Sequence, residues 1–257
     1  MNPLRRIGAA VLDLCEQIGA IASFAVISLA RGFVGPWYPA QILRQMIDIG
    51  FYSLPVVGLT AIFTGMVLAL QSYTGFARFE AESAVATIVV VSLTRELGPV
   101  LAGLMVAGRV GAAMAAELGT MRVTEQIDAL TTLSTDPQRY LVFPRLLAGT
   151  LMLPLLVMVA DVIGVFGGFL VGTTKLGFSP YTYMDQTWQY LEAQDVLVGL
   201  AKAAVFGFVV TLMGCWQGYQ SRGGAQGVGA ATTRAVVTGS ILILVFDYIM
   251  TEIFFTR

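Results

Sequence analysis

The chain has 257 residues, of which 56% are apolar and only 12% are charged, and its net charge is −1. A soluble domain carries about 25% charged residues, so this composition, with a mean hydropathy of +0.77, indicates an integral membrane protein. The near-neutral charge argues against a nucleic-acid partner. The absence of histidine removes the commonest metal ligand and the usual proton relay at neutral pH, so we expect no metal site.

The N-terminal segment has the pattern of an amphipathic helix, because apolar residues recur from Ile7 to Ala25 at steps of three and four. Its most apolar part, 18–30, is shorter than the roughly 18 residues that a membrane span needs. Trp37 then supplies an aromatic residue typical of the membrane interface. We therefore expect residues 1–48 to lie in or near the headgroup layer and residues 49–257 to form the membrane domain.

Five longer apolar segments follow, at 51–72, 83–116, 146–171, 196–219 and 233–255. Four of them suit a hydrocarbon core of about 30 Å. The second, about 33 residues or roughly 50 Å as a helix, must tilt, bend or project from the bilayer. The predicted fold is an all-α integral membrane protein with an interfacial N-terminal helix and five transmembrane helices.

Basic residues are distributed unevenly among the connections. With a cytoplasmic N-terminus, the cytoplasmic side would hold Arg5, Arg6, Arg31, Arg44, Arg122, Arg139, Arg145, Arg222 and Arg234. The opposite side would hold Arg78, Lys175 and Arg257, together with the acids Glu80, Glu82, Asp185, Glu192 and Asp195. The positive-inside rule therefore predicts a cytoplasmic N-terminus and a C-terminus on the other side.

A polar island at 120–144 separates the second and third spans. Thr124 is a suitable N-cap for a short helix, which Asp136 and Pro137 would end, so we predict a cytoplasmic helix at about 123–135. Apolar residues at intervals of three form a narrow stripe, and acids lie near the positive end of the helix dipole. Such a helix suits a docking partner, and its docking residues would be Glu125, Ile127, Asp128, Leu130 and Leu133.

Arg95 and Glu96 are adjacent charges inside the second span, followed closely by Pro99, which can kink a helix. Because an ionised residue at mid-bilayer costs about 2.5–3.5 kcal/mol, these two should face the protein interior or a wet cavity. Two interpretations stay open: a polar lining or hinge in a transport path, and an ion pair that locks helices together. For Arg109, on nearly the same helical side, the structural interpretation is favoured.

Three other ionisable residues lie in apolar surroundings. Asp161 and Asp247 could relay protons, although the sequence offers no coherent chain of acids between them. Lys202 is placed near the outer end of the fourth span, where its side chain would extend to the interface.

Two GxxxG spacings, at 164–168 and 214–218, predict close helix packing within the subunit. The glycine-rich segment 222–229 lacks the lysine and spacing of a phosphate-binding loop, so we interpret it as a flexible turn. We therefore expect no catalytic residue and no ATP hydrolysis on this chain.

Several motifs together resemble one family. They are GMVLALQSY at 65–73, LTRELGPVLAGLMVAGRVGAAMAAELGTMRVTEQIDAL at 93–130, TDPQRYLVFPRLLA at 135–148 and GVGAATTRAVV at 227–237. From about residue 50 onward the chain is similar to the Mla-type permeases (MlaE family) of ABC lipid transporters, which are associated with the lipid asymmetry of the outer membrane.

The resemblance implies a homodimer in the inner membrane of a Gram-negative bacterium, with two cytoplasmic ABC ATPases that hold ATP and Mg²⁺. It also implies a small STAS-like subunit, a periplasmic ring of MCE-domain proteins and phospholipid as the cargo. The helix at 123–135 would then be the coupling helix that seats in a groove of the ATPase. The residues that the resemblance places near the lipid are Leu70, Gln71, Tyr73, Arg95, Glu96 and Leu97.

Two alternatives remain open. An ion-coupled secondary transporter would use Arg95, Glu96, Asp161 and Asp247 and would need no ATPase. A membrane anchor that merely holds partners together would be indifferent to changes in these charges.

Overall fold

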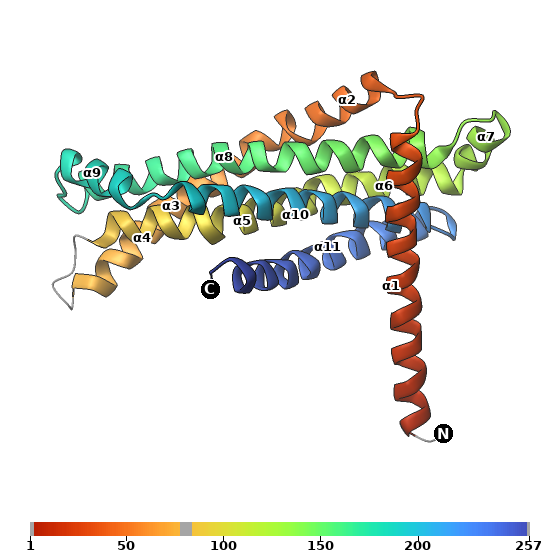
Figure 1. Ribbon diagram of the computed structural model, residues 1–257, viewed down its shortest axis with the longest axis horizontal. Coiled ribbons are helices and arrows are strands. Elements are labelled where there is room, and N and C mark those ends of the chain that lie inside the picture. The colour runs from red at the N-terminus through yellow and green to blue at the C-terminus, as the bar shows by residue number, and fades with distance from the viewer. Residues whose placement is uncertain (1–2, 78–83, 256–257) are drawn as a thin grey trace.

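The computed structural model describes residues 3–77 and 84–255, and within these ranges all regular elements are helices (Figure 1). The predicted charges at Arg78, Glu80, Glu82 and Arg257 lie outside the described residues. The long helices α3 (Leu54–Phe76), α8 (Phe143–Thr174), α10 (Ala193–Tyr219) and α11 (Gly224–Phe255) correspond to four of the five predicted spans. The remaining span is a composite of α4 (Val85–Ser92), η4 (Leu93–Leu97), α5 (Gly98–Val106), η5 (Ala107–Gly111) and α6 (Ala112–Val123).

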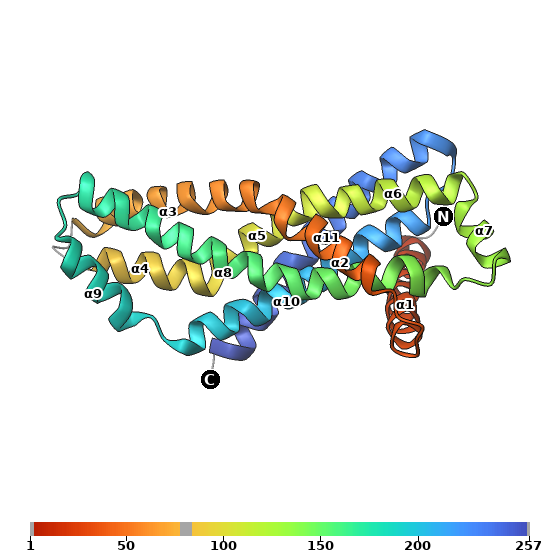
Figure 2. The same ribbon diagram turned by 90° about the horizontal axis from the view of Figure 1, so that it is seen from above.

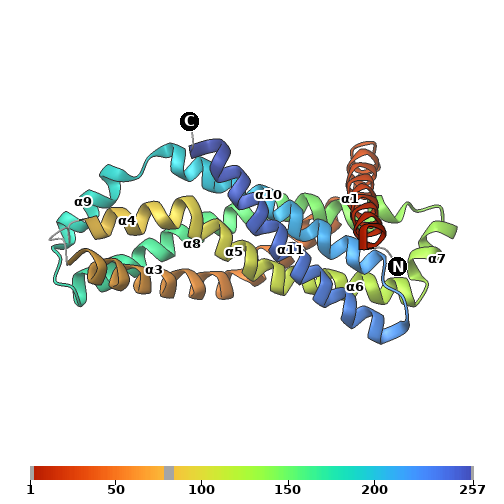
Figure 3. The same ribbon diagram turned by 90° about the horizontal axis from the view of Figure 1, so that it is seen from below.

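The spans form an elongated bundle in which α3 packs along α8, and α10 packs along both α8 and α11 (Figures 1 and 2). The core lies between α8, α10 and the composite span, where Leu153, Val157 and Phe206 are fully buried. Helix α11 crosses one face of the bundle obliquely (Figure 3). Only 11% of the residues in its most apolar 18-residue stretch are buried, so most of α11 is open to its surroundings.

Helix α1 (Pro3–Phe33) projects from the bundle near the end that holds α7, roughly at right angles to the spans (Figure 1). The expectation that its apolar part is too short for a span was wrong, because residues 11–33 are long and apolar enough to cross a membrane. Its direction nevertheless differs from that of the five spans, and large apolar residues such as Leu12 and Val26 are exposed along it. A helix perpendicular to a spanning bundle lies in the membrane plane, so the direction of α1 agrees with the predicted interfacial position.

Helix α2 (Pro39–Ile49) packs against α8 and leads through Gly50 and η1 (Phe51–Ser53) into α3. The expected division between residues 48 and 49 lies in the last turn of α2, just before this bend. Tyr38, just before α2, packs edge-on against Tyr140 with their ring centroids 5.0 Å apart. This contact joins the start of α2 to the segment that leads into α8.

The over-long second segment is a composite helix, Val85–Val123, that contains two π-helical turns. A π turn inserts an extra residue and widens the helix locally. The first, η4, carries Arg95 and Glu96, and the second, η5, carries Arg109. Pro99 follows η4 in the first turn of α5, where its missing N–H is tolerated.

Glycines allow the closest helix contacts. A methyl group on Gly65 of α3 would overlap the carbonyl of Gly164 on α8, and one on Gly214 of α10 would lie 3.0 Å from the carbonyl oxygen of Gly111. Both predicted GxxxG segments therefore pack within the subunit, as expected.

The two connecting helices lie at opposite ends of the bundle (Figures 1 and 2). Helix α7 (Gln126–Thr132) follows the composite span at one end, and α9 (Pro180–Tyr190) follows α8 at the other. The flexible turn expected at 222–229 is shorter than predicted, because α11 begins at Gly224. Gly223 and Gly224 carry the turn with φ angles of +88° and +71°.

Candidate functional site

A network of charged side chains joins η4, α10 and α11 inside the bundle. Lys202 of α10 lies at its centre, with a side chain that is 0% exposed. Its Nζ lies 2.6 Å from Oε2 of Glu96 and 2.9 Å from Oδ1 of Asp247. It also donates to the hydroxyl of Thr251 at 2.7 Å and to the backbone carbonyl of Arg95 at 3.2 Å. The prediction that Lys202 extends to the interface was therefore wrong.

Arg95 and Glu96 pair with different helices. The Nε of Arg95 lies 2.6 Å from Oδ1 of Asp195, whose side chain is only 1% exposed, at the start of α10. Glu96 instead accepts from Lys202 and from the hydroxyl of Thr251, the latter at 3.1 Å. The two residues therefore tie η4 to α10 and α11, which is the locking role that the sequence left open.

The charge network is partly exposed at the surface of the bundle. The side chains of Arg95 and Glu96 are each 35% exposed, and that of Asp247 is 21% exposed. When all groups are ionised, the cations Arg95 and Lys202 face the carboxylates of Glu96, Asp195 and Asp247. Among the described residues, one carboxylate is thus in excess, at an edge that a polar ligand can reach, so the locking role and a role as polar lining are compatible.

Arg109 has a separate structural role. It donates from Nη1 to the hydroxyl of Ser53 at 2.7 Å and to the backbone carbonyl of Asp48 at 3.0 Å. These bonds fasten η5 to the bend between α2 and α3, in keeping with the structural interpretation favoured from the sequence.

The other predicted cavity residues are spread along α3 and η4. Leu97 faces α3 and lines a narrow crevice with Thr60 and Thr64. Leu70 lies six residues beyond Thr64, about 9 Å along the helix, and is 38% exposed. Gln71 is also exposed, and Tyr73 packs against Phe178 with ring centroids 5.8 Å apart. Among the described contacts, none joins these three α3 residues to Arg95 or Glu96.

Helix α7 is shorter than predicted and begins differently. Thr124 is not its N-cap, because its hydroxyl donates to the carbonyl of Thr120 in the preceding helix at 2.8 Å. Glu125 turns the chain through a left-handed conformation, with φ of +59°, and α7 begins at Gln126. The apolar spacing located the helix, but a left-handed non-glycine residue leaves no reliable signal in a sequence.

The predicted docking residues divide into two groups. Ile127 is 1% exposed and packs into the core, so it anchors α7 to its own subunit. Leu130 is half-buried against that core, whereas Leu133 is 75% exposed. Asp128 pairs with Arg122 at 2.6 Å and keeps 60% of its side chain exposed. Most of the accessible surface of the predicted docking residues is therefore supplied by Leu133, Asp128 and Glu125.

Helix α1 ends against the segment that follows α7. Arg31 pairs with Asp136 at 3.1 Å, and Arg139 donates to the backbone carbonyl of Arg31 at 3.0 Å. Two turns earlier in α1, Phe24 packs edge-on against Trp216 of α10, with ring centroids 5.3 Å apart. The position of α7 is thus connected to α1 and to the end of a span.

Comparison with known proteins identifies the family. The family model described as permease MlaE matches residues 42–253. The chain belongs to the MlaE permease family.

A probable ABC transporter permease of Rickettsia bellii is 57% identical over 99% of this chain and 98% of its own length. The intermembrane phospholipid transport system permease MlaE of Haemophilus influenzae is 35% identical over 99% of this chain and 98% of its length. The chloroplast protein TRIGALACTOSYLDIACYLGLYCEROL 1 of Arabidopsis thaliana is 35% identical over 93% of this chain and 67% of its length. The chain is therefore a multi-pass ABC transporter permease of the MlaE family.

Proposed function

We propose that this chain is the membrane-spanning subunit of an ABC transporter that moves phospholipid between the inner membrane and a periplasmic carrier. Membership of the MlaE permease family and the name of the Haemophilus relative support this cargo. The N-terminus would be cytoplasmic and the C-terminus periplasmic, with α7 on the cytoplasmic side and α9 on the periplasmic side.

The observation that carries the coupling part of the proposal is the surface of α7. It holds an exposed leucine, Leu133, beside exposed acids at the end of the bundle where α1 is fastened. We take this leucine and the acids beside it as the contact surface for a protein partner. An ABC permease needs an ATPase, and α7 is where that subunit would dock and transmit its movement.

The open edge of the charge network would receive the lipid headgroup. The guanidinium of Arg95 suits a phosphate, and the carboxylates of Glu96 and Asp247 suit an ammonium group. Lys202 would then connect headgroup binding to the relative positions of α10 and α11.

A homodimer is the expected assembly, because α11 leaves most of its length uncovered and offers a free face for a second copy. The MCE-domain ring, the STAS-like subunit and a Gram-negative inner membrane complete the proposal by analogy with the family. ATP and Mg²⁺ would be bound by the ATPase, with no cofactor on this chain.

The alternative, an ion-coupled secondary transporter, has less support. Glu96 and Asp247 share Lys202 as a fixed partner, and Asp161 lies apart from them on α8. These acids therefore do not form a continuous relay along the bundle.

Gentle purification of the tagged chain from its native membrane, followed by mass spectrometry of bound proteins and lipids, tests the proposal. We expect an ABC ATPase, an MCE-domain protein and phospholipid to co-purify. A chain that carries no ATPase, in a detergent shown to preserve related complexes, would contradict the proposal and favour ion-coupled transport.

A further inference from the structure

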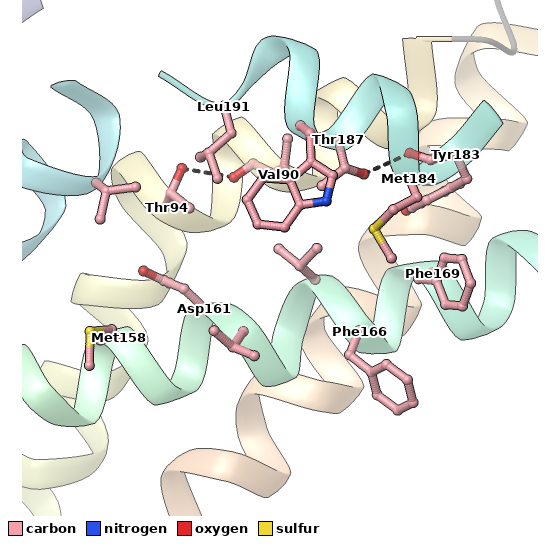
Figure 4. A pocket seen from close by; sticks show the side chains of 14 residues that line it. Val90, Thr94, Met158, Asp161, Phe166, Phe169, Tyr183, Met184, Thr187 and Leu191 are labelled. Atoms are coloured by element: carbon pink, nitrogen blue, oxygen red, sulfur yellow. Dashed lines mark hydrogen bonds between the residues drawn. The ribbon is translucent and has the colours of Figure 1, made fainter. Parts of the chain in front are cut away.

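A cavity of about 320 Å³ lies between α8, α9 and the α4–η4 part of the composite span. Its wall is formed largely by apolar and aromatic side chains, including Met158, Val162, Phe166, Phe169 and Trp188. Figure 4 shows Asp161 reaching into the cavity from α8, opposite Thr94. The cavity is thus an apolar pocket, open on one side, with one acidic group.

Asp161 has no partner in the described part of the chain. It is 8% exposed, and its Oδ1 is buried without a hydrogen bond. No described ion pair or hydrogen bond includes either carboxyl oxygen, whereas the intramembrane acids Glu96, Asp195 and Asp247 all have partners. A buried carboxylate without a partner is costly in apolar surroundings, and a donor supplied from outside would remove that cost.

The cavity lining also limits the chemistry of that donor. It includes an acid but neither lysine nor arginine, so a phosphate placed here would lack a positive partner and would meet Asp161. The volume lies at the lower end of the range for small-molecule sites, about 300–1,000 Å³. A two-chain phospholipid with its headgroup at Asp161 is therefore a poor fit, and a compact molecule with a single positive group is a good one.

We propose that this cavity binds hydrophobic amines, with the ammonium group on the Asp161 carboxylate and the apolar body against Met158, Phe166 and Trp188. An ammonium group supplies the missing hydrogen-bond donors and neutralises the carboxylate. Phe166, Phe169 and Trp188 provide apolar and aromatic contacts for the remainder of the ligand. This site is separate from the Lys202 network, to which Asp161 does not connect.

The position of Asp161 gives an occupant a way to affect transport. Gly98 directly follows η4, and the absence of a side chain there allows Oδ1 of Asp161 to approach the backbone. The residues just before Gly98, Arg95 and Glu96, pair with α10 and Lys202. An amine at Asp161 would therefore act on the same π turn as the charge network, and its effect on transport rests on the proposed function.

Binding is tested with radiolabelled dodecylamine on the purified transporter complex in nanodiscs, with protein-free nanodiscs as the background. We expect saturable binding that unlabelled dodecylamine displaces and that dodecanoic acid and dodecanol displace weakly. Asp161→Asn should lower the affinity by about tenfold to a hundredfold, because it removes a charged hydrogen-bond acceptor. Asp185→Asn, the same change at an exposed site on α9, should leave the affinity unchanged.

A second variant keeps the test independent of the stability of Asp161→Asn. Val162 lines the cavity but is 69% exposed, so Val162→Trp should fill the cavity without disturbing the core and should also abolish binding. Equal affinity in wild type and Asp161→Asn, or displacement by dodecanol as strong as by dodecylamine, would overturn the proposal. Binding to the isolated permease that is absent from the complex, with a partner helix cross-linked to Val162→Cys in the complex, would also overturn it, because the cavity would then be a helix-docking groove.

Discussion

At the scale of single residues, Lys202 is the shared cationic partner of two carboxylates inside the bundle. It is fully buried and connects a π turn, a long span and the open helix α11. The attraction of its two carboxylate partners offsets the desolvation cost of burying the ammonium group. The lysine in turn offsets the desolvation cost of burying the two carboxylates. A buried pair adds little net stability, but removal of one partner leaves an uncompensated charge.

Lys202→Met should therefore destabilise the protein by about 3–5 kcal/mol, because it leaves Glu96 and Asp247 without their shared cation. The measurement is the midpoint of thermal unfolding of the purified protein. Lys175→Met, at an exposed lysine outside the bundle, is the matched control and should change the midpoint little. Adding Glu96→Gln and Asp247→Asn to Lys202→Met should recover much of the loss; an unchanged midpoint for Lys202→Met alone would contradict the network's structural role.

The sequence predicts that Arg95 and Glu96 face inward, but it does not predict their partners. The cost of a charge in the membrane is a property of one position and can be inferred from one segment. Which helix faces which position depends on packing between segments far apart in the chain. Lys202 was therefore placed at the interface, Asp195 was counted only among the outer acids, and Thr251 was not considered. A lysine within the apolar fourth span was nevertheless a usable signal for a buried partner of these charges.

At the scale of elements, the composite second span and α7 form a continuous connection between the charge network and the end of the bundle. The span carries η4, η5 and α6 in sequence, and α7 follows after the left-handed turn at Glu125. Ile127 fastens α7 to the core, so movement of α7 would be transmitted to the span and not absorbed by a loose hinge.

Leu133→Asp should release the ATPase while the permease stays folded. It places a charge on the exposed apolar side chain at the end of α7 without removing a core contact. The measurement is the amount of ATPase retained on the tagged permease after affinity purification. Tyr181→Asp, an equally exposed change on α9 at the other end of the bundle, should retain the ATPase. Full retention with Leu133→Asp would remove the docking role from α7.

Element positions were predicted better than element geometry. Long apolar segments identify spans because the bilayer demands about 20 apolar residues per helix, and all five expected spans are present. The π turns were not predicted, because they depend on local backbone hydrogen bonds that no residue pattern specifies. The apolar length of α1 was misjudged because only its most apolar part, 18–30, was counted, whereas the average hydropathy stays high enough for a span from residue 11 to residue 33.

At the scale of the whole molecule, the bundle has two chemically different ends. One end holds α7, the end of α1 and the arginines Arg31, Arg122 and Arg139. The other holds α9 and the connection from α9 to α10, which carries Asp185 and Glu192. The resulting asymmetry of positive charge is the basis of the predicted orientation.

That orientation predicts which ends can be labelled from outside the cell. In a Cys15→Ser, Cys215→Ser background, Tyr181→Cys should react with a membrane-impermeant maleimide applied from the periplasmic side. Leu133→Cys, exposed at the opposite end, should react only after the inner membrane is permeabilised. The reverse pattern would invert the topology and remove α7 from the side on which an ATPase can dock.

Reconstitution of the purified complex in liposomes tests the central claim most directly, with transfer of a labelled phospholipid to an acceptor as the measurement. The account predicts that transfer depends on the ATPase and hydrolysable ATP, and that it falls in Glu96→Gln while the ATPase stays bound. Transfer by the permease alone, driven by a proton or sodium gradient and indifferent to ATP, would contradict it.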